Sequence, residues 1–292
     1  MNQSNNIELN WILPEPLKKS EIANTNFPFA LKAVLARRGI KQNEDILNFI
    51  YPPELPDPIN HFPELNKAVD RIIDAKKNNQ KIAICGDYDA DGMTSTALLS
   101  DALNQLNIDV VHSIPSRINE GYGLNTNIID NLYENSVELI ITVDNGVSAF
   151  KAINQCNNYG IDLIISDHHT IPNNIPYVYS LIHPLTTPEN SPYRYLAGVG
   201  IAFIIIKSLA DKLSNYSLSK KSLDYCCVGT IADMSPLIGA NRKLIKQGLS
   251  QLYKTRSIGL QELIRISGID YNEITSEDIG FKIAPRINAI GR

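Results

Sequence analysis

Residues 81–96 read KIAICGDYDADGMTST, an apolar run of strand length followed at once by the alternating aspartates Asp87, Asp89 and Asp91. Similar short apolar runs recur at residues 109–114, 138–143, 162–165 and 178–182. Stretches with helical character separate most of these runs, at residues 94–107, 126–133 and 149–158. Such alternation is typical of a parallel sheet covered by helices on both faces. The sequence therefore predicts an α/β fold with a doubly wound, mainly parallel, five-stranded sheet.

The chain on either side of this region has a different pattern. Residues 1–60 contain one short helical stretch, at residues 31–37, and four prolines between positions 52 and 58, which indicate an N-terminal extension with extended backbone. After Pro184 no further strand is expected. Helices are predicted instead at residues 197–213, 219–232, 242–252 and 260–266.

The composition excludes several protein classes. The 292 residues are 43% hydrophobic and carry a formal net charge of −4, which excludes a disordered, collagen-like or coiled-coil protein. The most apolar run, residues 196–206, falls short of the roughly 18 residues that a bilayer span needs, and the N-terminus lacks the regions of a signal peptide. The four cysteines show no CxxC spacing, so we expect no disulfide framework, no thiolate zinc site and a cytoplasmic location.

Acidic and imidazole side chains follow three of the predicted strands. Asp87, Asp89 and Asp91 follow the first, Asp144 follows the third, and Asp167, His168 and His169 follow the fourth. Ligands of open parallel sheets bind at the carboxyl ends of the strands, and converging carboxylates repel one another unless cations lie between them. The ligand types favour Mn²⁺ or Mg²⁺, with Zn²⁺ or Fe²⁺ also open, and a pair of ions about 3.5 to 4 Å apart would suit phosphoryl hydrolysis.

Each of these motifs has a simpler interpretation when taken alone. The Asp-x-Asp-x-Asp-Gly pattern also begins an EF-hand loop, but the position that should hold a bidentate Glu is Leu98. Asp144-Asn145-Gly146 alone would more often be a turn at the end of a strand. His168 and His169 are adjacent, so strand alternation predicts that they point in opposite directions and that at most one is a direct metal ligand.

Taken together, the motifs resemble the DHH phosphoesterase superfamily and, within it, the RecJ family of single-strand-specific 5′ to 3′ DNA exonucleases. The strings that carry this resemblance are ICGDYDADGMTST at residues 84–96, IPSRINEGYGL at residues 114–124 and PRINAIGR at residues 285–292. The resemblance runs from about residue 11 to residue 292. It implies a DHH phosphoesterase domain at residues 61–239 that hydrolyses phosphodiester bonds with a metal-activated water, in DNA repair and recombination. It also implies a helical connector at residues 240–292 that leads to a further domain.

The resemblance also assigns roles to individual residues. Its implied metal ligands are Asp87, Asp89, Asp91, Asp144 as the bridging carboxylate, His168 and Asp233. Its implied catalytic residues are His169, which would face the phosphate or the attacking water, and Asp167 of the same motif. Its implied contacts to DNA are Arg117, Arg286, Asn288 and Arg292. The implied partners are single-stranded DNA, a single-strand-binding protein and a repair helicase, with no membrane.

Three departures from the family pattern affect these expectations. Cys85 stands where many members carry a metal-binding histidine, so we expect it in the strand core and assign the second ion to Asp87. His183 stands where RecJ-like chains usually have asparagine, so a structural role is expected. No histidine follows position 183, so the second, DHH-associated domain and the OB-type DNA-binding domain are expected to be missing. An oligoribonuclease, a cyclic-dinucleotide phosphodiesterase and a non-catalytic RecJ-like binding module remain the alternative functions.

Overall fold

A computed structural model describes residues 13–115 and 123–291, and the chain divides into two compact units at Pro53. The first unit contains helices α1 (Phe29–Arg37) and α2 (Asn43–Ile50), of which only α1 was predicted. Its small core contains Ala23, Leu35 and Ile46. The division into residues 1–60, 61–239 and 240–292 stays a prediction.

The second unit is built on a five-stranded sheet with the strand order β2-β1-β3-β4-β5. All four neighbouring pairs of strands are parallel, which confirms the predicted sheet. The strands are β1 (Lys81–Cys85), β2 (Val110–Ser113), β3 (Val137–Val143), β4 (Asp162–Ser166) and β5 (Ser180–Ile182). The chain leaves β1 toward β2 and then crosses to β3 on the other side, so the topological switch point lies between β1 and β3. Ligands of doubly wound sheets bind at such a point.

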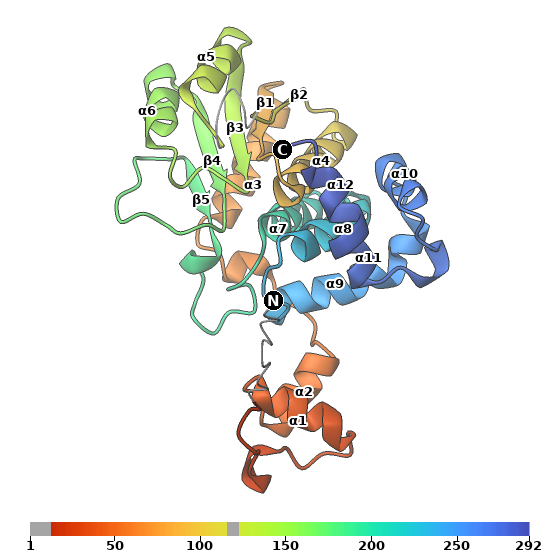
Figure 1. The fold of residues 1–292 in the computed structure, drawn as a ribbon. Coiled ribbons are helices and arrows are strands. Elements are labelled where there is room, and N and C mark those ends of the chain that lie inside the picture. The colour runs from red at the N-terminus through yellow and green to blue at the C-terminus, as the bar shows by residue number, and fades with distance from the viewer. Residues whose placement is uncertain (1–12, 116–122, 292) are drawn as a thin grey trace, which may run out of the picture. The chain divides into compact units, whose positions relative to one another are not determined.

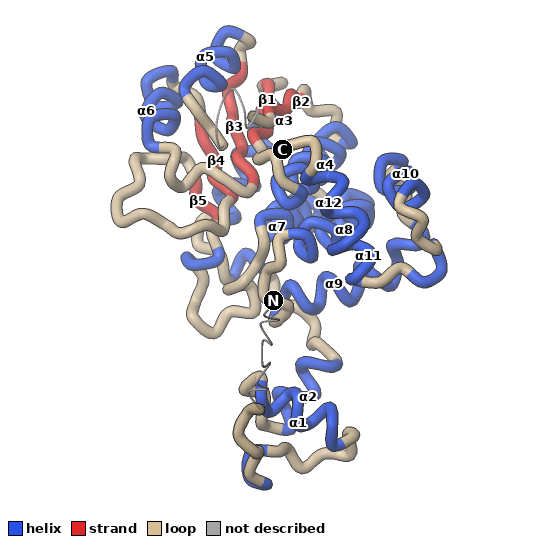
Figure 2. The backbone as a smooth tube through the Cα atoms, in the orientation of Figure 1, coloured by secondary structure: helices blue, strands red, loops and turns tan. Residues whose placement is uncertain are grey.

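Helices cover both faces of the sheet (Figure 1). One face is covered by α5 (Thr126–Glu134) and α6 (Phe150–Tyr159), and the opposite face by α3 (Leu65–Lys77), α4 (Ala90–Gln105) and α7 (Gly198–Lys212). Further from the sheet, α8 (Ser217–Ala232) packs against α4 and α7, and α9 (Gly239–Gln251) packs against α8. The remaining helices are α10 (Ile258–Ile266), α11 (Ser276–Asp278) and α12 (Ala284–Asn288), as the colouring in Figure 2 shows.

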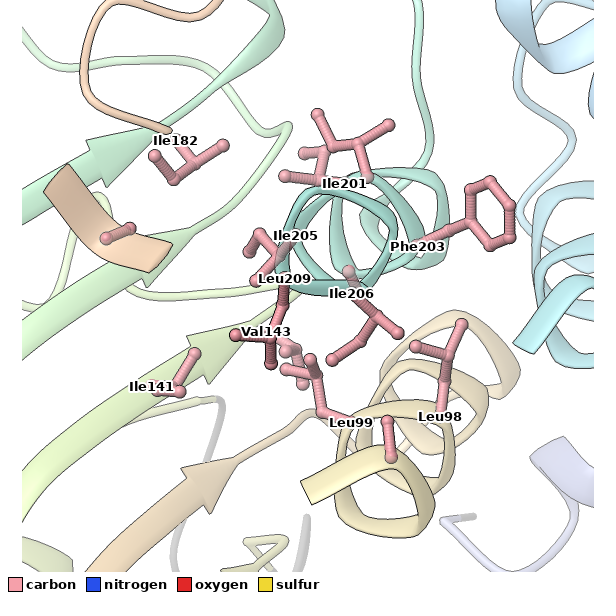
Figure 3. Close-up of a cluster of buried hydrophobic side chains, with 14 of the residues drawn as sticks. Leu98, Leu99, Ile141, Val143, Ile182, Ile201, Phe203, Ile205, Ile206 and Leu209 are labelled. Atoms are coloured by element: carbon pink, nitrogen blue, oxygen red, sulfur yellow. The ribbon is translucent and has the colours of Figure 1, made fainter. Parts of the chain in front are cut away.

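The sheet separates two apolar clusters because the side chains of a strand alternate between its faces. In β1, Ile82 and Ile84 belong to the cluster under α3, α4 and α7, whereas Ala83 and Cys85 belong to the cluster under α5 and α6. Cys85 is therefore strand core, as expected. Helix α7 supplies much of the first cluster, and Figure 3 shows its Ile205 on the side of the strands and its Ile206 on the side of α4. This burial explains the apolar run at residues 196–206, and no helix in the described part of the chain is long and apolar enough to cross a membrane.

Two helices differ from the sequence prediction, and the first difference matters for the site. Helix α4 begins at Ala90 and not at Thr94, because Asp89 is its N-cap and accepts a hydrogen bond from the backbone N–H of Gly92 at 2.9 Å. Aspartate and glycine are common both in turns and at helix N-termini, so the sequence pattern does not show that the helix begins within the acidic stretch. Helix α3 is not predicted from the sequence, although five of its apolar side chains are buried in the cluster on this face of the sheet.

Candidate metal centre

The three aspartates after β1 lie at the start of α4 and make different contacts. Asp91 accepts backbone hydrogen bonds from Gly198 at 2.7 Å and from Val199 at 2.8 Å, at the N-terminus of α7. Asp87 and Asp91 are almost completely buried. A Cβ atom at Gly92 would lie 2.6 Å from the backbone nitrogen of Asp87, so this turn requires glycine. The contact fixes Asp87 beside the first turn of α4.

Asp144 follows β3 directly and has an unusual backbone conformation. Its φ is 62°, in the left-handed region that aspartate and asparagine tolerate better than most residues. Its backbone N–H donates to the carbonyl oxygen of Ser166, and its side chain is 1% exposed. Non-glycine residues with this conformation concentrate at functional sites.

The residues after β4 form a hydrogen-bonded arrangement around Asp167. Its carboxylate accepts from the backbone N–H of Val147, His168 and His169, and it lies 2.8 Å from Nδ1 of His169. The expectation that the two histidines point apart is wrong, because their rings meet edge to face with centroids 4.6 Å apart. Strand β4 ends at Ser166, so the alternation of strand side chains no longer applies at these positions.

Asp233 reaches the same place from a helix end. It is the C-cap of α8, and its Oδ1 lies 4.0 Å from Nε2 of His168. The same Nε2 lies 3.0 Å from Asp144 Oδ1 and 3.8 Å from Asp91 Oδ2. One imidazole nitrogen is therefore surrounded by carboxylates from a strand end and from two helices.

The predicted ligands form three groups whose possible ligand atoms lie within 4.8 Å of one another. Asp87, Asp89 and Asp144 form one group, and Asp91, His168 and Asp233 form another. The third, Asp144 with His168 and His169, connects the first two because it shares Asp144 with one and His168 with the other. The first two groups share no residue, so they offer two possible cation positions, and the third group connects them.

The buried atoms of this cluster fit a cation. Asp87 Oδ1 is buried and makes no hydrogen bond within the described ranges, 13–115 and 123–291. A buried polar atom without a partner costs roughly 1 to 3 kcal/mol, which coordination to a metal would remove. The oxygen-rich donor set with imidazole suits Mn²⁺ or Mg²⁺.

The pKa values of the carboxylates show the effect of burying several acidic groups close together. Burial raises the pKa of Asp87 to about 6. Burial and repulsion by nearby aspartates raise the pKa values of Asp91 and Asp144 well above the ordinary range. Burial disfavours the charged form of Asp167 too, but hydrogen bonds from His169 and Val147 outweigh it and lower its pKa. The hydrogen bond to Asp167 in turn raises the pKa of His169.

The expected DNA-contacting residues are only partly described. Arg117 and Arg292 lie outside the described residues. Arg286 is exposed and donates to the carbonyl oxygen of Lys282 in its own helical segment. Asn288 accepts a hydrogen bond from the backbone N–H of Ala90, which places it beside the metal-ligand candidates.

Two further residues, Asn145 and Gly198, shape the site in ways that the sequence does not predict. The side chain of Asn145 donates to the carbonyl oxygens of Cys85 and Val143, so it ties the ends of β1 and β3 together. A Cβ atom at Gly198 would lie 2.7 Å from the Cβ of Asp144, so only glycine fits at the start of α7. The Asp144-Asn145-Gly146 motif indicates a turn but not the contacts of the Asn145 side chain, and Gly198 has no local sequence signal. His183 is structural, as expected, since its ring contacts the His169 carbonyl oxygen at 2.7 Å and accepts from the Leu185 N–H.

Comparison with known proteins identifies a family for this chain. Residues 81–230 match the DHH family, N-terminal domain. The single-stranded-DNA-specific exonuclease RecJ of Bacillus subtilis is 38% identical over 262 residues, which are 89% of this chain and 33% of that protein. The RecJ of Haemophilus influenzae is 36% identical over 80% of this chain and 42% of its own length. The chain thus spans between a third and a half of the curated relatives that it matches.

Comparison with solved structures also finds RecJ proteins. A crystal structure of exonuclease RecJ bound to manganese matches 82% of this chain and 58% of its own, with a TM-score of 0.72 and 33% identity. The structure of Thermus thermophilus RecJ in complex with Mn²⁺ matches 88% of this chain and 36% of its own, with a TM-score of 0.73 and 30% identity.

Proposed function

This chain belongs to the DHH family, and we propose that it is a metal-dependent hydrolase of phosphodiester bonds, a RecJ-type exonuclease that degrades single-stranded DNA from the 5′ end. The clustering of carboxylates and imidazoles at the switch point between β1 and β3 is the observation that carries this proposal. The DNA substrate is inferred from the RecJ relatives.

We assign two positions for Mn²⁺ or Mg²⁺ to this cluster. Asp87, Asp89 and Asp144 would hold one ion, and Asp91, His168 and Asp233 the other, with Asp144 between the two. Bound there, the ions would lower the pKa of a water and neutralise the charge of the phosphoryl group. The manganese-bound and magnesium-bound structures of RecJ relatives support this choice of metals.

His169 and Asp167 form a hydrogen-bonded pair that would place a proton donor beside the scissile phosphate. Asp167 holds Nδ1 of His169 at 2.8 Å and keeps the ring oriented. The raised pKa of His169 favours the protonated ring, which can donate to a phosphate oxygen. The His169 side chain is 48% exposed, so a substrate can reach it. Asp167 itself is buried and would act through His169.

We assign the strand-binding role to Arg117, Arg286 and Arg292, whose guanidinium groups can each hold a phosphate by two hydrogen bonds. In the domain arrangement that we propose, residues 61–239 form the catalytic domain, residues 1–60 form an N-terminal extension, and residues 240–292 form a helical connector. A role in DNA repair and recombination would bring in a single-strand-binding protein and a repair helicase as partners. The four free cysteines agree with a cytoplasmic location.

Release of mononucleotides from single-stranded DNA tests this function directly. With Mn²⁺ present, a 5′-labelled single strand should yield labelled mononucleotide, and EDTA should stop the reaction. Duplex DNA and a strand with a blocked 5′ end serve as controls. Preference for RNA dinucleotides or cyclic dinucleotides over longer DNA would favour the phosphodiesterase alternative. Binding of single strands without any cleavage would favour the non-catalytic module.

A further inference from the structure

A residue close to the C-terminal end of the chain holds the start of α4. Ala90 is the first residue of that helix, where a backbone N–H has no acceptor within the helix. The side-chain oxygen Oδ1 of Asn288 accepts this N–H at 2.7 Å, across 198 positions of sequence. The two neighbours of Ala90 in the chain are Asp89 and Asp91, so Asn288 binds the backbone between two of the proposed metal ligands.

Packing around the same point fixes the segment in place. Ala90 is 1% exposed and lies in one apolar cluster with Ile279, Ile283 and Ile287. Beyond Asn288, a Cβ atom at Gly291 would lie 2.7 Å from the carbonyl oxygen of Tyr88. The C-terminal segment therefore touches the chain on both sides of Asp89, and α12 lies beside α4 in Figure 1.

The helix that carries Asn288 contains a π turn. Residues Ile279–Ile283 are π-helical, and the N–H of Ala284 donates to the carbonyl oxygen of Ile279, five residues back. Pro285 follows and has no N–H to donate, which a regular α-helix would not accommodate at this point. One added residue changes the direction of every later side chain by about 100° around the helix axis. The π turn thus determines that Asn288 faces Ala90.

We propose that Asn288 is a positioning residue of the metal centre, which fixes the orientation of Asp89 and Asp91 by capping the N-terminus of α4. The proposal rests on the proposed metal-binding function. It differs from the expectation that Asn288 contacts DNA, because its Oδ1 is already bonded to Ala90.

Replacing Asn288 tests this role without relying on activity. In metal-free protein labelled with [¹⁵N]alanine, Asn288→Ala should speed hydrogen exchange of the Ala90 amide by about fivefold to tenfold, because it removes one hydrogen bond. Calorimetric titration with Mn²⁺ should show a loss of affinity of about tenfold, the usual effect of removing a group that orients metal ligands. In steady-state assays kcat should fall more than KM rises.

Two further variants separate the possible outcomes. Asn288→Asp keeps an acceptor oxygen and should retain slow exchange at Ala90, whereas Lys282→Ala removes only an exposed ion pair with Asp278 in the same segment and should match the wild type. If Asn288→Ala changes neither the exchange rate of the Ala90 amide nor the Mn²⁺ affinity and only raises KM, the positioning role is wrong and Asn288 contacts DNA instead. If the wild-type chain takes up no Mn²⁺, the proposed function fails, and Ala90 exchange still decides whether Asn288 caps α4.

Discussion

At the scale of single residues, Asp144 combines three features that rarely occur together. It is buried, it has a left-handed backbone, and its side chain belongs to two of the three ligand groups. A buried carboxylate among other carboxylates destabilises the metal-free protein, so its presence is best explained by a bound cation.

Replacing Asp144 by asparagine tests this explanation. Asparagine tolerates the left-handed conformation, so Asp144→Asn should fold normally and, with one like charge fewer, melt at a higher temperature than the wild type in EDTA. Mn²⁺ affinity should fall at least about tenfold, and hydrolysis should be lost. Asp109→Asn, at the opposite end of the strands, is the matched control. Full Mn²⁺-dependent activity in Asp144→Asn would exclude the bridging role.

Met234 offers a second test at this scale. It follows the C-cap of α8 with a φ of 61°, a position where helices favour glycine, and its side chain is 88% exposed. Met234→Gly should therefore raise the free energy of unfolding by up to about 1 kcal/mol, since the relief of backbone strain exceeds the entropy cost of glycine. Urea denaturation measures this. A destabilised variant would mean that the methionine side chain makes stabilising contacts.

The raised pKa values of the site predict how stability depends on pH. The pKa of Asp87 is about 6 when folded against an ordinary value of 3.8, so between these values the folded protein binds more protons than the unfolded chain. The free energy of unfolding of the metal-free protein should therefore fall as the pH rises through this window. Asp91 and Asp144 shift in the same direction and extend the fall to higher pH.

Denaturation in EDTA at several pH values checks this dependence. Saturating Mn²⁺ should remove the fall, because bound cations compensate the ionised carboxylates. The Asp144→Asn protein should show a weaker dependence than the wild type. If the free energy of unfolding in EDTA rises from pH 4 to pH 6, the pKa values of these carboxylates are not raised by burial and mutual repulsion.

At the scale of elements, the N-terminus of α7 arranges two aspartates from different parts of the sheet. Its backbone N–H groups at Gly198 and Val199 bind the carboxylate of Asp91, where the helix dipole also favours a negative charge. The missing side chain of Gly198 leaves the space that Asp144 occupies. One helix end thus brings the segments after β1 and β3 together.

Gly198→Ala should disturb this arrangement. The added methyl group would lie 2.7 Å from Asp144 Cβ, so we expect a loss of roughly 1 to 3 kcal/mol in stability and weaker Mn²⁺ binding. The control is Gly259→Ala in α10, where the nearest atom is 3.9 Å away and alanine should be neutral or slightly stabilising. Thermal melting and Mn²⁺ titration compare the two variants. If the two variants have the same melting temperature and the same Mn²⁺ affinity, α7 can shift to accept a side chain at position 198.

At the scale of the whole molecule, every described residue of the metal centre belongs to the unit that begins at Glu54. The sheet, its two apolar clusters and the C-terminal segment that contacts α4 belong to the same unit. The first unit has its own small core. Metal binding should therefore not need the first unit.

A chain of residues 54–292 tests this independence. It should fold cooperatively and bind Mn²⁺ within about twofold of the affinity of the full chain, because no ligand candidate is removed. The same truncation carrying Asp144→Asn provides the negative control. A tenfold or greater loss of Mn²⁺ affinity in the truncated chain would show that residues 1–53 contribute to the centre.

The sequence alone determined the α/β class, the five strands and the positions of most ligand candidates. Apolar runs and helical periodicity are local patterns, and the carboxyl ends of parallel strands necessarily share one edge of a sheet. The tertiary structure decided which strands are neighbours, that His168 and His169 meet, that Gly198 adjoins Asp144 and that Asn288 caps α4. These contacts join segments as far apart as 198 positions, and no local pattern records which distant segments pack together. The family resemblance alone pointed to Asp233, because one aspartate at a helix end has no distinctive local signal.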